Sequence, residues 1–287
     1  MPDHDIIDEA KPWLVIPYFA GDKGRKGIER DPLPLPAIWW LCTGMRVNGG
    51  PLREYTPGEP TVVDVDVCNY GGGAAETLAT VTVWWSAPTV GFGPARWFGE
   101  AQTVLASKGG ADTVTVTGTI PAGYPHVCLL VGVEAAFNDN LPDVIGPGSD
   151  RHWAQLNIDV VKAPDGVFRQ KFLVGNPQDV PARVHVRARL LAGEQLAAAA
   201  EALQVNPFRP DRAELRVLTA AGEDPPERLE GAVPVDLEPG GSVALELRGE
   251  ISPPPEPGTA AIVEIVQYAP YDPDAVMGAL AVAVTND

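Results

Sequence analysis

Two stretches of this 287-residue chain carry the same order of alternating apolar and polar residues, and this internal repeat constrains the fold most strongly. Successive side chains of a β-strand point to opposite faces, so each alternating segment predicts a strand with one buried face. The corresponding segments of the two copies are 63–71 and 168–177, 79–85 and 182–188, 113–117 and 243–247, 127–133 and 261–267, and 156–160 and 280–284. Two copies of this length predict tandem β-sandwiches rather than a solenoid of many repeats.

The repeat divides the chain into three parts. Residues 1–55 are expected to form an N-terminal arm and first strand region, residues 56–162 the first sandwich and residues 163–287 the second. The polar turn at 162–166 between the copies is short, which indicates a restricted hinge. The predicted fold class is therefore all-β, with two tandem antiparallel β-sandwiches, an N-terminal arm and one short helix in the second domain.

The short helix is predicted where the second copy departs from the first. Residues 194–203 are strong helix formers, and their apolar members share one stripe at helical spacing. The members of this stripe are Leu196, Ala199, Ala200 and Leu203. We expect a helix that covers a sheet edge; the alternative is an extended edge strand with a small-residue face.

The N-terminal arm also leaves two alternatives. Residues 13–18 read as a strand or an extended segment. The arm either packs on its own domain or docks onto a neighbouring subunit as a donated strand. Residues 37–42 are expected to supply the first strand of the first sandwich.

Composition excludes several classes of protein. The chain is rich in turn residues, with 30 Gly and 30 Pro, yet its 45% of hydrophobic residues is too high for a disordered chain. The net charge of −17 argues against nucleic-acid binding, because phosphates are neutralised by clustered Lys and Arg. The apolar runs are too short for a membrane-spanning helix, so we expect no membrane insertion. The N-terminal residues do not resemble a signal peptide, which predicts cytoplasmic synthesis.

The three cysteines, Cys42, Cys68 and Cys128, are odd in number and lack the spacing of a metal site. Cys68 shares a strand face with Asp64 and Asp66, and Cys128 lies opposite the apolar face of its own strand. We therefore expect both thiols on outer surfaces and no disulfide between them. The two aspartates are expected to form part of a charged coat that discourages edge-to-edge pairing.

The Val-x-Val-x-Val-x-Asn-x-Gly pattern of residues 63–71 resembles CARDB-like and related bacterial immunoglobulin-like domains. So do the later segments, from the strand at 113–117 through a Pro-Gly corner and an apolar strand to the last strand at 150–157. The likeness covers residues 56–162 and, more faintly, 163–287. It implies antiparallel, seven-stranded immunoglobulin-like sandwiches used as adhesive, spacer or assembly modules. The family carries no catalytic residues that would transfer.

The residue types of catalysis and metal binding form no recognisable constellation. Ser149, Asp150 and His152 are close in sequence, which does not by itself produce the geometry of a catalytic triad. Acidic residues gather around Asp139, Asp143 and Asp150, which either belong to an ordinary turn-rich loop or hold Ca²⁺. We expect no cofactor and no enzymatic activity. A hydrolase that uses paired carboxylates of this loop is the enzyme alternative.

Aromatic residues are concentrated in and before the first sandwich. The candidate binding residues are Trp39, Trp40, Trp84, Trp97 and Phe98. Adjacent residues of a strand face opposite ways, so one of Trp39 and Trp40 should face outward. The same rule directs Trp84 outward and Trp85 inward. An outward tryptophan is a contact anchor, is covered by the arm, or stacks on a sugar ring.

These observations predict a non-enzymatic structural or interaction protein that binds protein partners or assembles with itself. It would serve as a subunit, decoration or adaptor of a larger assembly, and a virion component or part of a phage-like or contractile-injection-type particle is one form of that role. A chain without a signal peptide reaches such a particle by assembling before release. The alternative function is a carbohydrate-binding β-sandwich module that uses exposed tryptophans to hold a glycan.

Overall fold

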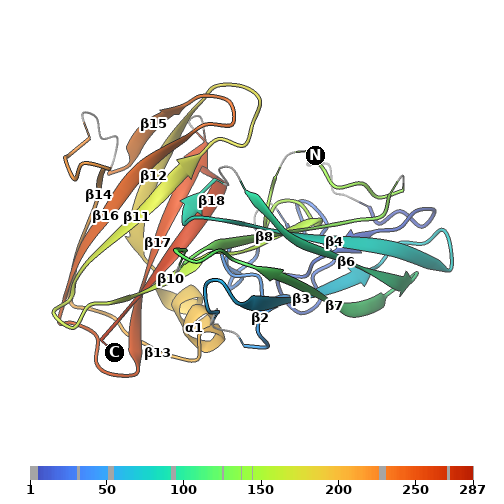
Figure 1. Ribbon diagram of the computed structural model, residues 1–287, viewed down its shortest axis with the longest axis horizontal. Helices are drawn as coiled ribbons and strands as arrows, with labels where there is room; N and C mark the ends of the chain where they lie inside the picture. The colour runs from blue at the N-terminus through green and yellow to red at the C-terminus, as the bar shows by residue number, and fades with distance from the viewer. Residues whose placement is uncertain are drawn as a thin grey trace. The chain divides into compact units, whose positions relative to one another are not determined.

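The computed structural model describes residues 6–30, 33–50, 55–91, 95–124, 126–136, 138–143, 145–225, 231–269 and 272–286. Within them the chain is nearly all β, with eighteen strands and one short helix (Figure 1). No helix of the described residues is long and apolar enough to span a membrane.

The chain forms two compact units, and neither is one contiguous stretch. Unit 1 comprises Met1–Trp85, Ala95–Pro125 and Leu129–Leu156. Unit 2 comprises Ser86–Pro94, His126–Cys128 and Asn157–Asp287. The contiguous domains expected from the sequence, 1–55, 56–162 and 163–287, differ from these units and stay a prediction.

Unit 1 is a sandwich of two four-stranded sheets. In the first sheet β3 lies between β7 on one side and the short strands β1 and β2 on the other, and all these pairs are antiparallel. Its strands are β1 (Leu14–Val15), β2 (Met45–Val47), β3 (Pro60–Asn69) and β7 (Gly110–Thr119). The second sheet has the order β6 (Arg96–Ala106), β4 (Glu76–Ser86), β8 (Cys128–Glu134) and β9 (Trp153–Leu156).

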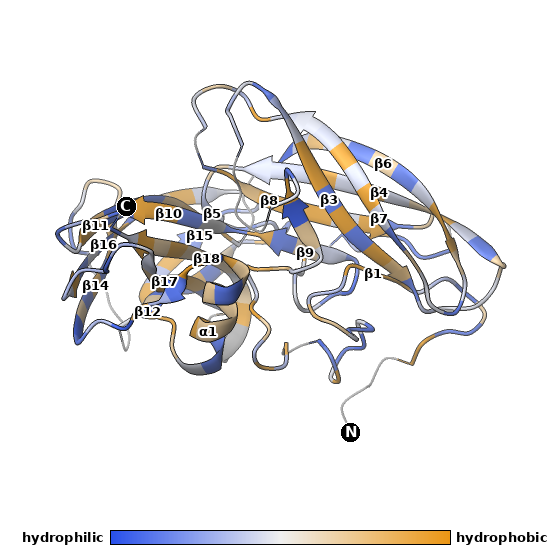
Figure 2. Ribbon diagram, turned by 90° about the horizontal axis from the view of Figure 1, so that it is seen from below, coloured by the Kyte–Doolittle hydropathy of each residue, from blue (hydrophilic) through white to orange (hydrophobic). Residues whose placement is uncertain are grey.

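Strand β3 follows the predicted alternation, which Figure 2 shows as bands of opposite hydropathy. Its alternate valines are buried, and Asp64 and Asp66 lie half-buried on the other face. The hydroxyl groups of Thr115 and Thr113, on β7, donate to Asp64 and Asp66 at 2.7 Å. Because β3 is paired on both sides, these aspartates do not protect a sheet edge, and that part of the expectation is wrong.

Unit 2 is a second sandwich. Its larger sheet has the order β10-β18-β17-β12-β15, with β13 beside β17, and its smaller sheet has the order β14-β16-β11-β5. The strands of the larger sheet are β10 (Ile158–Lys162), β12 (Ala182–Leu190), β13 (Asn206–Pro207), β15 (Val233–Leu237), β17 (Thr259–Ala269) and β18 (Asp272–Thr285). Those of the smaller sheet are β5 (Thr89–Val90), β11 (Val167–Gly175), β14 (Arg212–Thr219) and β16 (Ser242–Ser252).

Both sheets of unit 2 contribute to one apolar core. Phe172 of β11 and Leu247 of β16 come from the smaller sheet, and Val186 of β12 and Val263 of β17 from the larger one. Most strand pairs are antiparallel, but β10–β18, β11–β5 and β13–β17 are parallel. The predicted closing strand at 156–160 is in fact two strands, because β9 ends at Leu156 in unit 1 and β10 begins at Ile158 in unit 2.

The predicted helix is α1 (Gly193–Ala202), which contacts β13 and β17 (Figure 1). All four residues of the predicted stripe, from Leu196 to Leu203, are buried. The helix therefore forms as its spacing predicts and packs its apolar side against unit 2.

The arm packs within unit 1, which is the first of its two alternatives. Strand β1 pairs with β3, and the N–H of Ile16 donates to the carbonyl oxygen of Arg151 at 3.0 Å. Residues 37–42 do not form the expected first strand; they hold only isolated bridges at Ile38 and Leu41. The arm's short strands instead extend the sheet of β3.

All three cysteines are thiols in the structure. Cys68 is half-buried, but Cys128 is only 2% exposed and belongs to the core of unit 2. The N–H of Thr89 donates to its Sγ at 3.3 Å, and the thiol also contacts Asn157. The expectation of an outer-surface Cys128 is therefore wrong, because alternation assigns a face but cannot say what covers it.

Candidate functional site

The outer face of β6 and β4, which points away from the core of unit 1, carries an exposed aromatic side chain. All seven tryptophans lie in the described residues, and Trp97 is the one that is exposed, at 63%. Trp97 pairs across the strands with Trp84, which is half-buried. The Trp84 ring packs on Trp153 of β9 with centroids 5.6 Å apart and planes tilted by 43°. Three indoles therefore follow one another from β6 across to β9.

A β-bulge directs Trp97 outward. The register between β4 and β6 shifts at Trp84, and Phe98 and Gly99 are both buried although they are consecutive. A Cβ atom at Gly99 would lie 2.9 Å from the carbonyl oxygen of Thr117, so this close approach requires glycine. The extra residue reverses the alternation of β6, placing Phe98 in the core and Trp97 in solvent.

Polar residues occupy the middle of this face. Beyond the tryptophans, the outward cross-strand pairs are Thr82 with Glu100, Thr80 with Gln102, and Leu78 with Val104. The Nε2 of Gln102 donates to the hydroxyl of Thr80 at 3.1 Å. Leu78 and Val104 are 55% and 56% exposed and form an apolar end opposite the tryptophans. We call these eight residues, from Leu78 to Trp84 on β4 and from Trp97 to Val104 on β6, the β4–β6 face.

Arg96 stands beside the β4–β6 face. Its guanidinium lies 4.9 Å from the ring centroid of Trp85 and 5.2 Å from that of Tyr124, and Nη1 donates to the Tyr124 hydroxyl at 3.1 Å. Trp85 points inward and is 3% exposed, as its parity predicts. The arginine therefore covers a core indole and is engaged by a neighbouring hydroxyl.

The structure separates the predicted aromatic residues into two groups. Trp84 and Trp97 lie together on the β4–β6 face. Trp40 and Phe98 are 0% and 3% exposed, so we assign them to the core and no longer to a binding surface. Trp39 is half-buried in the arm, where its carbonyl oxygen accepts hydrogen bonds from the Tyr18 hydroxyl and Gln155. Sequence reasoning missed Trp153, because its place beside Trp84 depends on the pairing of β8 with β9.

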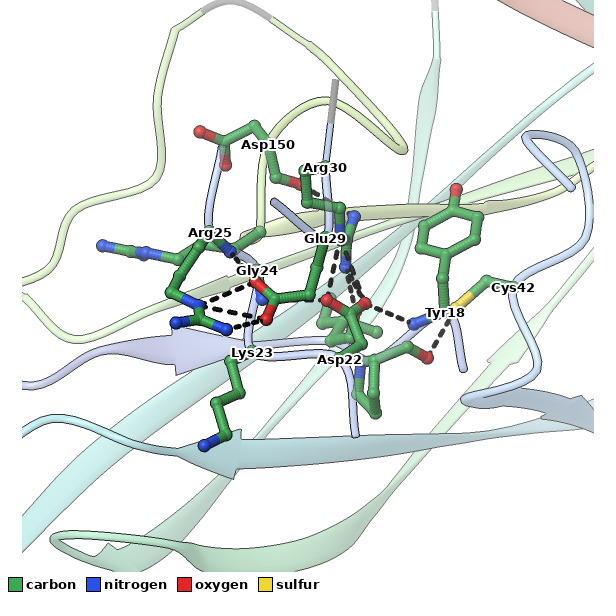
Figure 3. Close-up of polar contacts among 12 residues, drawn as sticks. Tyr18, Asp22, Lys23, Gly24, Arg25, Glu29, Arg30, Cys42 and Asp150 are labelled. Carbon is green, nitrogen blue, oxygen red and sulfur yellow. Dashed lines mark hydrogen bonds and ion pairs between the residues drawn. The ribbon is translucent and has the colours of Figure 1, made fainter. Parts of the chain in front are cut away.

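A buried ion pair fixes the arm (Figure 3). Arg30 and Asp22 are both 0% exposed, and Nη2 of the arginine lies 2.7 Å from Oδ2 of the aspartate. Asp22 also accepts hydrogen bonds from the N–H groups of Tyr18 and Gly24, and Arg30 donates to the carbonyl oxygen of Ile16. Both charges are thus paired and hydrogen-bonded, as buried charges must be.

Asp139 and Asp150 of the acidic loop are likewise paired with basic side chains. Asp139 Oδ2 accepts a hydrogen bond from the N–H of Leu14 at 2.7 Å, and Oδ1 lies 2.5 Å from Arg151 Nη2. Nε2 of His152 lies 3.2 Å from Asp139 Oδ1, and its Nδ1 lies 2.8 Å from Asp150 Oδ1. We call the six residues that join the arm to this loop the arm clasp: Asp22, Arg30, Asp139, Asp150, Arg151 and His152.

Burial and hydrogen bonding oppose each other in the arm clasp. Burial lowers the pKa of His152, but its bonds to Asp139 and Asp150 outweigh this and raise the pKa above its usual value. Burial would raise the pKa of Asp150, but the hydrogen bonds and charge of His152 hold it below its usual range. Both groups therefore favour their charged forms.

In the described part of this loop, no triad or calcium-site geometry is seen. Asp143 is exposed, and among the described residues no group of three His, Cys, Asp or Glu side chains is placed to hold a metal ion. The Ser149 hydroxyl donates to the carbonyl oxygen of Gly146. The structure thus shows Asp139 and Asp150 as partners of Arg151 and His152.

The described residues of unit 1 line cavities beside the arm. One of about 600 Å³ is bounded by the arm, β3 and β7, and its lining includes Phe19, Asp66, Cys68 and Tyr70. Burial raises the pKa of Cys68, and burial together with the nearby thiol raises that of Tyr70 to about 12, so both groups are protonated at neutral pH. Another, of about 380 Å³, adjoins His152 in the arm clasp.

No family model matches this chain, and no curated protein matches it. Among solved structures, a collagen adhesin from S. aureus aligns over 85% of this chain and 92% of its own, with 10% identity and a TM-score of 0.24. CBD12 from CALX1.2 aligns over 75% and 76%, with 12% identity and a TM-score of 0.18. A beta-glucosidase from Paenibacillus barengoltzii aligns over 47% of this chain and 16% of its own, with 16% identity and a TM-score of 0.21.

With TM-scores this low, none of these likenesses indicates what the chain does. The all-β sandwich architecture is seen directly in its sheets. The resemblance to CARDB-like domains rests on sequence motifs and stays a prediction.

Proposed function

We propose that this chain is a non-enzymatic interaction protein that contacts its partner through the β4–β6 face. The observation that carries the proposal is Trp97, which is 63% exposed and is held outward by a bulge that admits only glycine at position 99. Large exposed aromatic side chains dominate the binding energy of many interfaces. A bulge that re-aims such a side chain is a feature expected of a contact surface.

The state of the reactive groups supports a non-enzymatic role. Burial raises the pKa of the Cys42 thiol to about 12, and burial also raises that of Cys68, so neither supplies a thiolate at neutral pH. Both ring nitrogens of His152 face carboxylates of the arm clasp. These side chains serve packing and the attachment of the arm.

The sequence predicts three classes of partner: a protein, a further copy of this chain, or a glycan. In a larger assembly, including a phage-like or contractile-injection-type particle built in the cytoplasm, the β4–β6 face would contact a neighbouring subunit. Mass photometry over a range of protein concentrations tests self-assembly directly. Substitution of Trp97 by alanine should then abolish the larger species.

Photo-crosslinking tests whether the β4–β6 face contacts a partner, even when that partner is unidentified. A photoreactive amino acid replaces Gln102, which is exposed on the β4–β6 face, in the cells that make the protein. We expect crosslinked products that disappear when Trp97→Ala is added. The matched control places the same probe at exposed Lys171 of unit 2. Crosslinks that persist in the Trp97→Ala protein, or that form equally from position 171, would contradict the proposal.

A further inference from the structure

The chemistry of the β4–β6 face points to a carbohydrate, and we propose that its ligand is an uncharged oligosaccharide. This inference rests on the proposed function, since it names the ligand class of the same face. Four properties of the face carry it: the aromatic end, the polar middle, the length and the charge.

The aromatic end provides the stacking group. Trp97 is 63% exposed, and Trp84 lies opposite it on the neighbouring strand. The face of an indole ring is apolar and carries the negative part of the ring quadrupole. The C–H groups on one side of a pyranose ring are apolar and weakly positive, so they complement this surface. The equatorial hydroxyl groups lie in the plane of the sugar ring and stay free to bond with neighbouring side chains.

The polar middle meets those hydroxyl groups. Thr82 and Glu100 follow directly after the tryptophan pair, and Thr80 and Gln102 come next. A carboxylate accepts hydrogen bonds, and hydroxyl and amide groups both donate and accept, which matches the mixed character of sugar hydroxyls. Within the described residues, the Glu100 carboxylate has no hydrogen bond or ion pair that would compete with a ligand.

Of the partner classes that the proposed function leaves open, this arrangement favours a glycan over a protein. Protein interfaces have an apolar core inside a polar rim, and glutamate is depleted in that core. The β4–β6 face is arranged the other way, with Glu100 and Gln102 in the middle and apolar residues at both ends. A partner protein would have to desolvate the Glu100 carboxylate, whereas a sugar hydroxyl replaces its water.

The length of the face fits a chain of sugars. Strands rise about 3.3 Å per residue, so Trp97 and Val104 are separated by about 20 Å once the bulge is allowed for. This length accommodates several sugar rings in line along β6. The exposed Leu78 and Val104 pair then offers a second apolar contact at the far end.

The negative charge of Glu100 and of the whole chain favours an uncharged ligand. Glu100 is the charged side chain of the face, and the whole chain has a net charge of −17. Arg96, beside the face, is already engaged by the Tyr124 hydroxyl and lies against the Trp85 ring. Sulfated or uronic-acid glycans would therefore be repelled, while neutral glycans would not.

The test is a glycan array followed by titration calorimetry on the full chain, with neutral hexasaccharides of glucose, xylose, mannose and N-acetylglucosamine, and with heparin and polygalacturonate as acidic probes. We expect binding of at least one neutral hexasaccharide, weaker binding of its trisaccharide, and no binding of the acidic probes. Trp97→Ala should weaken binding at least tenfold, and Glu100→Gln several-fold. Val167→Ala, an exposed position on β11 of unit 2, should leave binding unchanged. Circular dichroism confirms that each variant is folded.

Two outcomes overturn the inference: no neutral glycan binds the wild-type chain, or Trp97→Ala binds as tightly as the wild type. These failures are separable from failure of the proposed function. If no glycan binds but Trp97-dependent crosslinks to a protein form from position 102, the carbohydrate inference is wrong and the interaction surface stands. If neither glycan binding nor Trp97-dependent crosslinks are found, both are wrong.

Discussion

The two units attach their additional segments by different chemistry. Unit 2 packs α1 through a stripe of leucine and alanine side chains, whereas unit 1 holds its N-terminal arm through the arm clasp, including the fully buried Arg30–Asp22 pair. Apolar contacts are non-directional, but buried charges require exact partners. The arm therefore has one permitted position and a pH-dependent attachment, whereas the docking of α1 depends on apolar packing.

Removing one charge from the clasp should have the largest effect. Asp22→Ala leaves Arg30 buried without a counter-charge, which typically costs about 3–5 kcal/mol of unfolding free energy. The loss is measured by urea unfolding, and hydrogen exchange of residues 13–30 shows that the arm is released. The double variant Asp22→Leu with Arg30→Met removes both charges and should recover much of the stability. Equal losses in the single and double variants would mean that charge is not the reason for the clasp.

Truncating the stripe of α1 should cost less. Leu196→Ala removes a buried side chain near the surface of unit 2, where the site can partly collapse, so we expect a loss of about 2–3 kcal/mol. Hydrogen exchange of residues 193–203 reports the effect. Glu201→Ala, an exposed position on the same helix, is the control and should change stability by less than about 0.5 kcal/mol. Similar losses for both variants would argue against packing as the basis of helix docking.

The pH should distinguish the arm from the helix. Because the pKa of His152 is raised in the folded chain, its contribution is fully present below the unfolded value of about 6.5 and is lost as the pH rises through the folded pKa. The groups facing it are Asp139, Asp150 and Arg151. Unit 1 should therefore lose about 1.4 kcal/mol for each unit by which the pKa is raised.

Hydrogen exchange of the arm and of α1 between pH 5.5 and 8.5 checks this expectation in one sample. The arm should lose protection at the higher pH, and His152→Gln should remove that dependence. His185→Gln in unit 2 is the control and should leave it in place. A pH-independent arm would show that His152 does not titrate in this range.

The smallest effect is expected at a second, partly exposed ion pair of the arm. The side chains of Arg25 and Glu29 are 32% and 11% exposed, whereas those of Arg30 and Asp22 are fully buried. Because the arginine still reaches solvent, Arg25→Ala should cost about 1 kcal/mol in urea unfolding, less than the loss of a fully buried partner. A loss as large as that of Asp22→Ala would mean that burial does not set the value of these pairs.

Sequence periodicity predicts those parts of the fold that depend on local geometry. The alternation of β3, the stripe of α1 and the opposite directions of Trp84 and Trp85 all follow from the 2.0 and 3.6 repeats. These features need only the identity of neighbouring residues. They are enough to establish the all-β class and to choose between strand and helix.

The remaining features depend on contacts between residues far apart in the chain. The hydrogen bond from the N–H of Leu14 to Asp139 joins residues that are 125 positions apart, so no local sequence pattern predicts it. The bulge at Phe98 and Gly99 reverses a parity that would otherwise direct Phe98 outward. The burial of Cys128 likewise depends on the core of unit 2 and not on its own strand. The sequence therefore predicts the candidate site as a set of aromatic residues, and the structure supplies its geometry.

The interleaved composition of the two units limits how this chain can be divided into fragments. Val90 and Cys128 belong to the core of unit 2, and β5 pairs with β11, yet these residues are encoded within the stretch that forms most of unit 1. A gene fragment for 163–287 would omit β5, β10 and both core side chains. Because unit 2 takes strands and core side chains from both sides of residue 162, we expect a fragment of residues 163–287 alone to be less stable than unit 2 in the full chain.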